Sequence, residues 1–262
     1  MLNYPDIDPV ALALGPIKIH WYGITYVVSI VSAWYLLRWR AGKNPLLGWK
    51  QEHIDDMVFF ATLGIIVGGR LGSVLFYNLP YYLDHPIDIF KINKGGMSFH
   101  GGLIGVLLAM FWFARKTNST FFQVTDFIAP VVPIGLGCGR IGNFINGELW
   151  GAPSSLPWAM VFPGAGAMPR HPSQLYEVFL EGILLFIILW FYSAKPRPIM
   201  AVSGLFLLGY GLFRSSVEFV REPDAHLGYL AFDWVTMGMV LSLPMIVFGI
   251  VLIVLAYRKV KE

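Results

Sequence analysis

Charged residues are scarce in this chain. Asp, Glu, Lys and Arg make up 13% of its 262 residues, against about 25% in ordinary soluble domains. Hydrophobic residues reach 56% and aromatic residues 16%. Because apolar runs of about 20 residues recur along the chain, the sequence predicts an integral membrane protein. The net charge of +3 is small, and the basic residues are spread between the apolar runs, which argues against nucleic-acid binding.

Cysteine is almost absent. Cys138 is the only one, which excludes an intramolecular disulfide and a thiolate metal cluster built from this chain alone. The histidines and carboxylates also lack ligand spacing within one polar cluster, so we expect neither a metal nor another cofactor. Cys138 lies among glycines with no base near it in sequence, which favours a packed core residue over a catalytic nucleophile.

The N-terminus lacks the basic residues of a secretory signal. Two acids and two prolines occupy the first nine positions, so we expect no cleaved signal and a first span that stays in the membrane. The sequence also lacks internal repeats and low-complexity stretches. We therefore expect residues 1–262 to form a single membrane domain.

Seven apolar segments are long enough to cross a bilayer, and they predict an all-α, polytopic bundle of seven transmembrane helices. In the second segment, Gly64, Gly68 and Gly72 recur every fourth residue and favour close helix packing. In the fourth, Pro130 and Pro133 precede several glycines, so we expect its second half to be kinked or partly unwound. The expected spans cover about 21–39, 55–77, 98–116, 121–141, 174–194, 203–220 and 237–257.

Two connections between these spans are unusual. Residues 79–96 are rich in proline and charge, which predicts a polar loop. Residues from about 144 to 173 contain five prolines together with large aromatic side chains. This second stretch is too irregular to span the membrane and too apolar to be a free linker, so we expect a small cap at the outer, periplasmic interface.

Basic residues are distributed unevenly between the two sides of the expected bundle. Placing the C-terminus in the cytoplasm puts eleven of the nineteen Lys and Arg residues inside and five outside, with three inside spans. Positive residues favour the cytoplasmic side, so we expect a periplasmic N-terminus and a cytoplasmic C-terminus. The inner set is Arg38, Arg40, Lys43, Lys50, Arg115, Lys116, Lys195, Arg197, Arg258, Lys259 and Lys261; the outer set is Lys18, Lys91, Lys94, Arg170 and Arg221.

Arg140 follows directly on an apolar run, where a charge needs a functional reason. An arginine at that depth costs roughly 2.5–3.5 kcal/mol on insertion scales. A planar guanidinium binds phosphate oxygens with two donors, and the nearby asparagines add neutral donors. We therefore expect a phosphate partner. The alternative is that Arg140 forms an internal, structural ion pair with Glu148.

A second polar group lies on the sixth span. Tyr210, Arg214, Glu218 and Arg221 share one helical stripe, which favours a polar site on that face. An Arg214–Glu218 salt bridge that serves only packing is the alternative, and it is compatible with a ligand role.

The second and third spans each carry one candidate. Arg70 lies near the glycine face of the second span, where it could join a polar centre, form a structural ion pair or extend to the interface. His100 lies among glycines in the third span. It could be a proton acceptor, or simply a histidine hydrogen-bonded to a neighbour.

Several of these stretches resemble one family. Residues 139–148, His100 with the glycines at 101–102, residues 170–177 and the segment from Tyr210 to Asp224 are similar to motifs of the phosphatidylglycerol–prolipoprotein diacylglyceryl transferases. The resemblance implies transfer of the diacylglyceryl group of phosphatidylglycerol to the lipobox cysteine of a lipoprotein precursor. It also implies a bacterial inner-membrane enzyme whose active site faces the periplasmic leaflet.

The resemblance also implies roles for particular residues. It implies a catalytic group comprising His100, Arg140, Arg214, Tyr210 and Glu218, and a phosphatidylglycerol site comprising Arg140, Asn143, Asn146, Glu148 and Gly151. To this phosphatidylglycerol site we add Tyr22, Arg70 and Arg221 as expected members. Whether His100 or Tyr210 is the base stays open. The rival functions are an anionic-lipid transporter or flippase that uses the same arginines, and a membrane scaffold whose charges only fix packing. A transporter predicts internal repeats and polar residues through both halves of the bundle, and neither is found.

Overall fold

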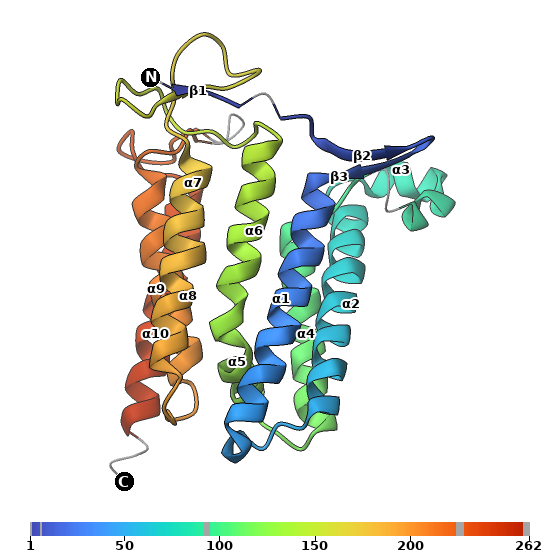
Figure 1. Cartoon of the computed structure of the whole chain (residues 1–262), viewed down its shortest axis with the longest axis vertical. Coiled ribbons are helices and arrows are strands. Elements are labelled where there is room, and N and C mark those ends of the chain that lie inside the picture. Colours follow the sequence, from blue (N-terminus) through green and yellow to red (C-terminus); the bar gives the residue numbers. More distant parts are fainter. Residues whose placement is uncertain (1, 6, 92–94, 224–227, 259–262) are drawn as a thin grey trace. The chain divides into compact units, whose positions relative to one another are not determined.

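The computed structural model describes residues 2–5, 7–91, 95–223 and 228–258. This part of the chain is mostly helical (Figure 1). Four of its helical stretches are long and apolar enough to cross a membrane: Gln51–Phe76, Phe121–Ile145, Ser173–Tyr192 and Met237–Arg258. Contacts divide the chain into two compact units, one comprising Met1–Ala33 and Asp126–Glu262, the other Trp34–Thr125.

Each of the seven expected spans contains a helix at nearly the expected position. The long helices are α1 (Trp21–Lys43), α2 (Gln51–Phe76), α4 (Phe99–Lys116), α5 (Phe121–Ile128) with α6 (Val132–Ile145), α7 (Ser173–Glu177) with α8 (Leu185–Tyr192), α9 (Ala201–Glu218) and α10 (Met237–Arg258).

Two helices have the free N–H groups of their first turn bound by a side chain that lies outside that helix. Ser98 precedes α4, and its hydroxyl accepts from the Gly101 N–H at 3.1 Å. The Asp126 carboxylate, distant in sequence, accepts from the Met200 and Ser203 N–H groups at the start of α9, both at 2.7 Å. Such caps satisfy donors that the helix itself leaves unpaired.

The fourth span is irregular at its prolines and not in its glycine-containing second half, where irregularity was expected. A short 3₁₀ turn, η4 (Ala129–Val131), separates α5 from α6 at the prolines. The glycine-containing half then stays helical from Val132 to Ile145, so the expected unwinding there is wrong. The reason is that Pro130 and Pro133 fall in first-turn positions, where a missing N–H does no harm. In addition, Gly137 packs against Gly182 and Gly142 packs against Tyr22.

Short strands and helices also occur where none were expected, so the all-α expectation needs correction. β2 (Val10–Leu14) pairs with β3 (Ile17–His20) as an antiparallel hairpin, and β1 (Leu2–Asn3) pairs in parallel with β4 (Met160–Val161). The expected loop at 79–96 contains α3 (Leu79–Asp84) and a 3₁₀ turn, η2 (Pro86–Phe90). Of that loop, residues 92–94 lie outside the described residues.

In the unit comprising residues 34–125, α2 and α4 pack against each other along their glycines, as the spacing predicted (Figure 1). A Cβ added to Gly72 would lie 2.7 Å from the Gly101 Cα, and one added to Gly64 would lie 3.1 Å from the Ala109 Cβ. Such approach leaves no room for side chains, so the small-residue face holds the two helices together.

In the other unit, α9 packs against α10 and α8, and α6 packs against a π-helical segment, η5 (Val178–Leu184), that joins α7 to α8. The expected cap at 144–173 is irregular but ordered. Ala159 and Phe162 are buried within it, and backbone bridges join Pro153 and Met160 to Arg170. The cap is tied to the end of α9 by other contacts, because Gly151 forms a backbone bridge with Arg221 and the Ala152 N–H donates to the Val220 carbonyl.

Candidate functional site

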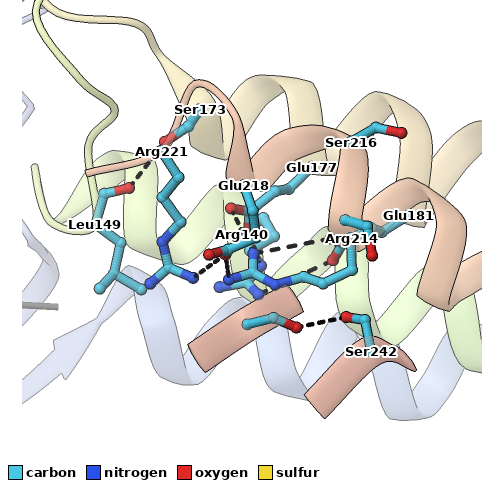
Figure 2. Close-up of polar contacts among 12 residues, drawn as sticks. Arg140, Leu149, Ser173, Glu177, Glu181, Arg214, Ser216, Glu218, Arg221 and Ser242 are labelled. Atoms are coloured by element: carbon cyan, nitrogen blue, oxygen red, sulfur yellow. Dashed lines mark hydrogen bonds and ion pairs between the residues drawn. The ribbon is translucent and has the colours of Figure 1, made fainter. Parts of the chain in front are cut away.

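The candidate site is a cluster of arginines and glutamates contributed by α6, α7, η5, α9 and the turn that follows α9 (Figure 2). Arg140 on α6 contacts Glu177 through Nε, and the Arg214 Nη1 on α9 lies 3.1 Å from the other oxygen of the same carboxylate. Glu177 is 1% exposed. One buried carboxylate therefore holds two guanidinium groups from different helices.

This geometry corrects the partner that was considered for Arg140. The internal ion pair with Glu148 does not form, because Arg140 pairs with Glu177 and approaches Glu181 at 3.9 Å. About a fifth of the Arg140 side chain stays accessible. The Arg140 guanidinium is thus held by a buried carboxylate, while part of the Arg140 side chain remains accessible.

Glu218 organises the other side of the cluster. Its Oε1 contacts Nη2 of Arg214, one helical turn away, and lies 3.5 Å from Nη1 of Arg221. The buried Thr236 hydroxyl donates to its Oε2. The predicted Arg214–Glu218 pair is therefore present, within a larger network. Arg214 and Glu218 are 8% and 5% exposed, so this network lies inside the protein.

The asparagines of the 139–148 stretch form a separate network around Glu148. Asn143 and Asn146 donate to the Glu148 Oε1 at 2.8 and 3.2 Å, and the Gln174 amide donates to the Glu148 carbonyl at 2.6 Å. The Glu148 side chain is thus occupied by neutral amides, and the residue is exposed. This network fixes the C-terminal end of α6.

Gly151 joins the cap to the end of α9. Its N–H donates to the His171 carbonyl at 2.9 Å, and its carbonyl accepts from the Arg170 Nη1 at 3.2 Å. It also forms a backbone bridge with Arg221. A Cβ here would lie 2.7 Å from the His171 Cβ, so only glycine fits. Burial lowers the pKa of the His171 imidazole below its usual value.

Two tyrosines lie beside this cluster in the same unit. The Tyr22 ring on α1 packs against Gly142 of α6, where an added Cβ would lie 2.6 Å from a ring carbon, and its hydroxyl lies 3.2 Å from the Tyr26 hydroxyl. The Tyr210 ring stacks on Phe206 of α9.

Arg70 occupies a different environment, in the unit of residues 34–125. Its five N–H donors are all used by backbone carbonyls between Asp88 and Gly96, and its guanidinium lies 5.2 Å from the Tyr82 ring centre. An arginine so bound has no donor left for a phosphate. Arg70 therefore has a structural role, but its partners are backbone carbonyls and not the carboxylate of the ion pair considered from the sequence, and this arrangement argues against a lipid-binding role.

His100 lies in the first turn of α4, in that same unit. Its side chain is exposed, and its ring meets the Phe99 ring edge to face. Among the described residues its imidazole has no hydrogen bond, so the alternative of a histidine merely bonded to a neighbour finds no support.

Sequence reasoning missed four members of the cluster. Glu177 and Glu181 are visible as two acids one turn apart, but nothing in the sequence pairs either of them with Arg140 or Arg214, which lie 37 residues before and after Glu177. Thr236 and Gly238 give no signal at all. Their positions depend on how α10 packs against α9, which only the folded chain reveals.

Gly238 offers a test of the Glu218 network. A Cβ there would lie 2.6 Å from the Glu218 Oε1, so Gly238→Ala should displace the carboxyl group from Arg214. Overpacking of this kind lowers the stability of the fold by about 1–3 kcal/mol. We expect the diacylglyceryl transfer implied by the resemblance to become roughly tenfold slower. Gly23→Ala, where an added Cβ meets open space, should keep its turnover. Equal rates for the two variants would show that the position of Glu218 does not matter.

The chain is similar to known proteins over nearly its whole length. The family model of prolipoprotein diacylglyceryl transferase matches residues 9–255. The phosphatidylglycerol–prolipoprotein diacylglyceryl transferase of Pseudomonas paraeruginosa is 61% identical over 259 residues, covering 99% of this chain and 97% of that protein. The protein of the same name from Methylococcus capsulatus is also 61% identical, with 99% of each chain covered.

A third relative gives nearly the same result. The phosphatidylglycerol–prolipoprotein diacylglyceryl transferase of Oleidesulfovibrio alaskensis is 60% identical over 262 residues, covering 100% of this chain and 98% of that protein. The similarity therefore spans every element that contributes to the arginine and glutamate cluster. The chain is a multi-pass membrane protein and belongs to the prolipoprotein diacylglyceryl transferase family.

Proposed function

We propose that this protein transfers the diacylglyceryl group of phosphatidylglycerol to the lipobox cysteine thiol of a prolipoprotein, forming a thioether and releasing glycerol phosphate. The observation that carries the proposal is the pair of guanidinium groups, Arg140 and Arg214, held by the buried carboxylate of Glu177. Fixed donors of this kind suit a phosphodiester in a low-dielectric site. The full-length identity of about 60% to transferases of that name supports it.

The reaction requires one bond to form and one to break. The cysteine thiolate attacks the glyceryl carbon that carries the phosphate ester oxygen, and the carbon–oxygen bond breaks as the carbon–sulfur bond forms. The electron pair of the broken bond stays on the phosphate oxygen, so charge develops there. Guanidinium groups that are already oriented stabilise this charge without reorganising.

The headgroup site in this proposal lies around α6 and α9. Arg140, Arg214 and Arg221 supply charged donors, and Tyr210 and Glu218 orient Arg214. The remaining lining is Asn143, Asn146, Glu148, Gly151 and Tyr22. Arg70 is left out, because its donors are occupied by carbonyl groups.

His100 is the proposed proton acceptor for the substrate thiol. A cysteine must lose its proton to become a strong nucleophile, and an imidazole can take that proton near neutral pH. His100 is exposed and has no hydrogen bond among the described residues, so its ring nitrogens are available. Tyr210 remains the alternative base.

The proposed setting is the bacterial inner membrane. α1, α4 and α9 have 23, 18 and 18 residues, and with the four apolar stretches they make a single domain of seven membrane-spanning helices. The N-terminus is periplasmic, the C-terminus is cytoplasmic, and the arginine cluster faces the periplasmic leaflet. The charge asymmetry supports this orientation, although Lys94, Lys259 and Lys261 lie outside the described residues.

Topology makes one prediction of its own. We expect a reporter fused after Glu262, which lies outside the described residues, to be located in the cytoplasm. Only a reporter that is active in the cytoplasm should then give a signal. A cytoplasmic fluorescent protein and a periplasmic phosphatase, fused in parallel at this position, form the matched pair. Phosphatase activity without fluorescence would reverse the proposed orientation.

The transferase itself is tested with purified protein. Incubating it with phosphatidylglycerol and a lipobox peptide should increase the peptide mass by that of one diacylglyceryl group. A peptide with serine in place of the cysteine is the control and should stay unchanged. The rival transporter function predicts no change in either peptide, but movement of labelled phosphatidylglycerol between the leaflets of a vesicle.

A further inference from the structure

Glu181 is the member of the cluster whose surroundings fit least well with a charged carboxylate. It is 0% exposed, and neither of its oxygens has a hydrogen-bond donor within the part of the chain that the structure describes. The nearest cationic nitrogens, one on Arg140 and one on Arg214, both lie 3.9 Å away. A buried charge without hydrogen bonds is strongly unfavourable, and weak contacts at this distance do not offset the loss of water.

The cations around Glu181 are already engaged elsewhere. Arg140 contacts Glu177, and Arg214 contacts both Glu177 and Glu218. Tyr210 and Arg221 also act on Glu181 electrostatically. These groups come from α6, α7, α9 and the turn after α9, the elements that surround this carboxyl group. Glu181 therefore has no cation of its own.

The backbone around Glu181 is also unusual. It lies in the π-helical segment η5, between regular helices α7 and α8. Single wide turns of this kind are rare and are frequent at functional sites. The next residue, Gly182, packs directly on Gly137 of α6, with an added Cβ only 2.9 Å from the Gly137 Cα. This contact brings the carboxyl group close to Arg140 on the neighbouring helix.

The charges of the buried cluster can be compared with those of a lipid headgroup. Arg140, Arg214 and Arg221 supply three positive charges, and Glu177 and Glu218 supply two negative ones. If Glu181 were ionised, the cluster would be neutral. If Glu181 is protonated, one positive charge remains, which equals the single negative charge of a phosphodiester.

Two other acids do not alter this comparison. Glu148 is exposed and is bound by amides, so solvent screens its charge. Glu222 forms its own pair with Arg170 at 2.8 Å.

We propose that Glu181 is a neutral positioning residue, whose retained proton leaves the arginine cluster with the one positive charge that matches a phosphodiester headgroup. The inference rests on the proposed function. Glu181 exchanges no proton with the substrate, and it acts only through the charge and orientation of Arg140 and Arg214.

The first measurement is infrared absorption of the purified protein, because a protonated carboxylic acid absorbs at higher frequency than a carboxylate. The wild type should show a carboxylic acid band that Glu181→Gln removes. Glu177→Gln, one turn earlier and facing the same arginines, is the matched control and should keep that band. A band that survives Glu181→Gln, or no band at all, overturns the proposal.

The second measurement is phosphatidylglycerol binding against pH, in phosphatidylcholine nanodiscs of fixed composition. Ionisation of Glu181 adds a negative charge beside the arginines, so wild-type affinity should fall roughly tenfold as pH rises. Glu181→Gln cannot ionise there and should keep the low-pH affinity throughout. A wild-type affinity that does not change with pH, or one that changes equally in Glu181→Gln, contradicts the inference.

Turnover completes the test. Glu177→Gln should lose at least tenfold in turnover at neutral pH because two arginines lose their anchor, and Glu181→Gln should lose clearly less, since the amide imitates a neutral acid. Equal losses in both variants would make Glu181 an ionised partner instead. The peptide-mass assay on the wild type is run first, and its failure would refute the transferase whatever Glu181 does.

Discussion

His100→Gln should lower diacylglyceryl transfer by about 10²–10⁴-fold, the usual contribution of a general base. Glutamine keeps the size and hydrogen-bonding character of the side chain but cannot take the thiol proton. His100 lies in the first turn of α4 and makes no hydrogen bond among the described residues, so the substitution breaks no hydrogen bond of the fold described there. The loss should appear in kcat, with phosphatidylglycerol binding little changed.

A matched control is available in the same unit. His85 is exposed in the connection after α3, and its ring lies 3.1 Å from the Tyr81 carbonyl. His85→Gln should transfer at the wild-type rate. If His100→Gln were as active as His85→Gln, the proton would have to leave by another route, and Tyr210→Phe would then be expected to show the large loss.

The sequence predicted the helices well because their signals are local. Apolar length, flanking charge and the Gly64, Gly68 and Gly72 repeat all act within one segment or between two neighbours. The α2–α4 contact and the Arg214–Glu218 pair follow the expected spacing. These features could be read before folding, since each depends on residues a few positions apart or on a repeated face.

The arginine cluster could be predicted only in part, because its partners come from distant segments. Arg140 and Arg214 meet at Glu177, which is 37 residues from each. The pattern around Arg140 suggested Glu148, a nearer acid, but the amides of Asn143 and Asn146 occupy that carboxylate. Proximity in sequence was thus a poor guide to pairing.

Arg70 also shows that sequence context alone does not identify the role of a buried arginine. From sequence it resembles Arg140, since each is an arginine near glycines within an apolar span. In the structure, part of the Arg140 side chain remains accessible. All N–H donors of Arg70, in contrast, are hydrogen-bonded to backbone carbonyls of residues 88–96. Only the surrounding backbone separates an arginine that can bind a ligand from one that holds a loop.

Arg140→Lys should slow transfer by about a hundred- to a thousandfold. Lysine keeps the positive charge, but it loses the planar pair of donors that can bind two phosphate oxygens and Glu177 together. Losing one well-placed donor to the developing negative charge costs about 3–4 kcal/mol in the barrier. The protein should still insert and fold, because lysine and arginine have similar insertion costs at that depth.

The opposing hypothesis is that Arg140 serves only as a counter-ion for Glu177. A lysine would then substitute with little loss, since a single charge suffices to balance one carboxylate. Arg38→Lys is the matched control, because Arg38 also pairs with a carboxylate, Asp55 at 2.6 Å, but on an exposed surface. The measurement is diacylglyceryl transfer by both purified variants. Equal, near-wild-type rates would reject phosphate binding by Arg140 and leave the ion pair as its only role.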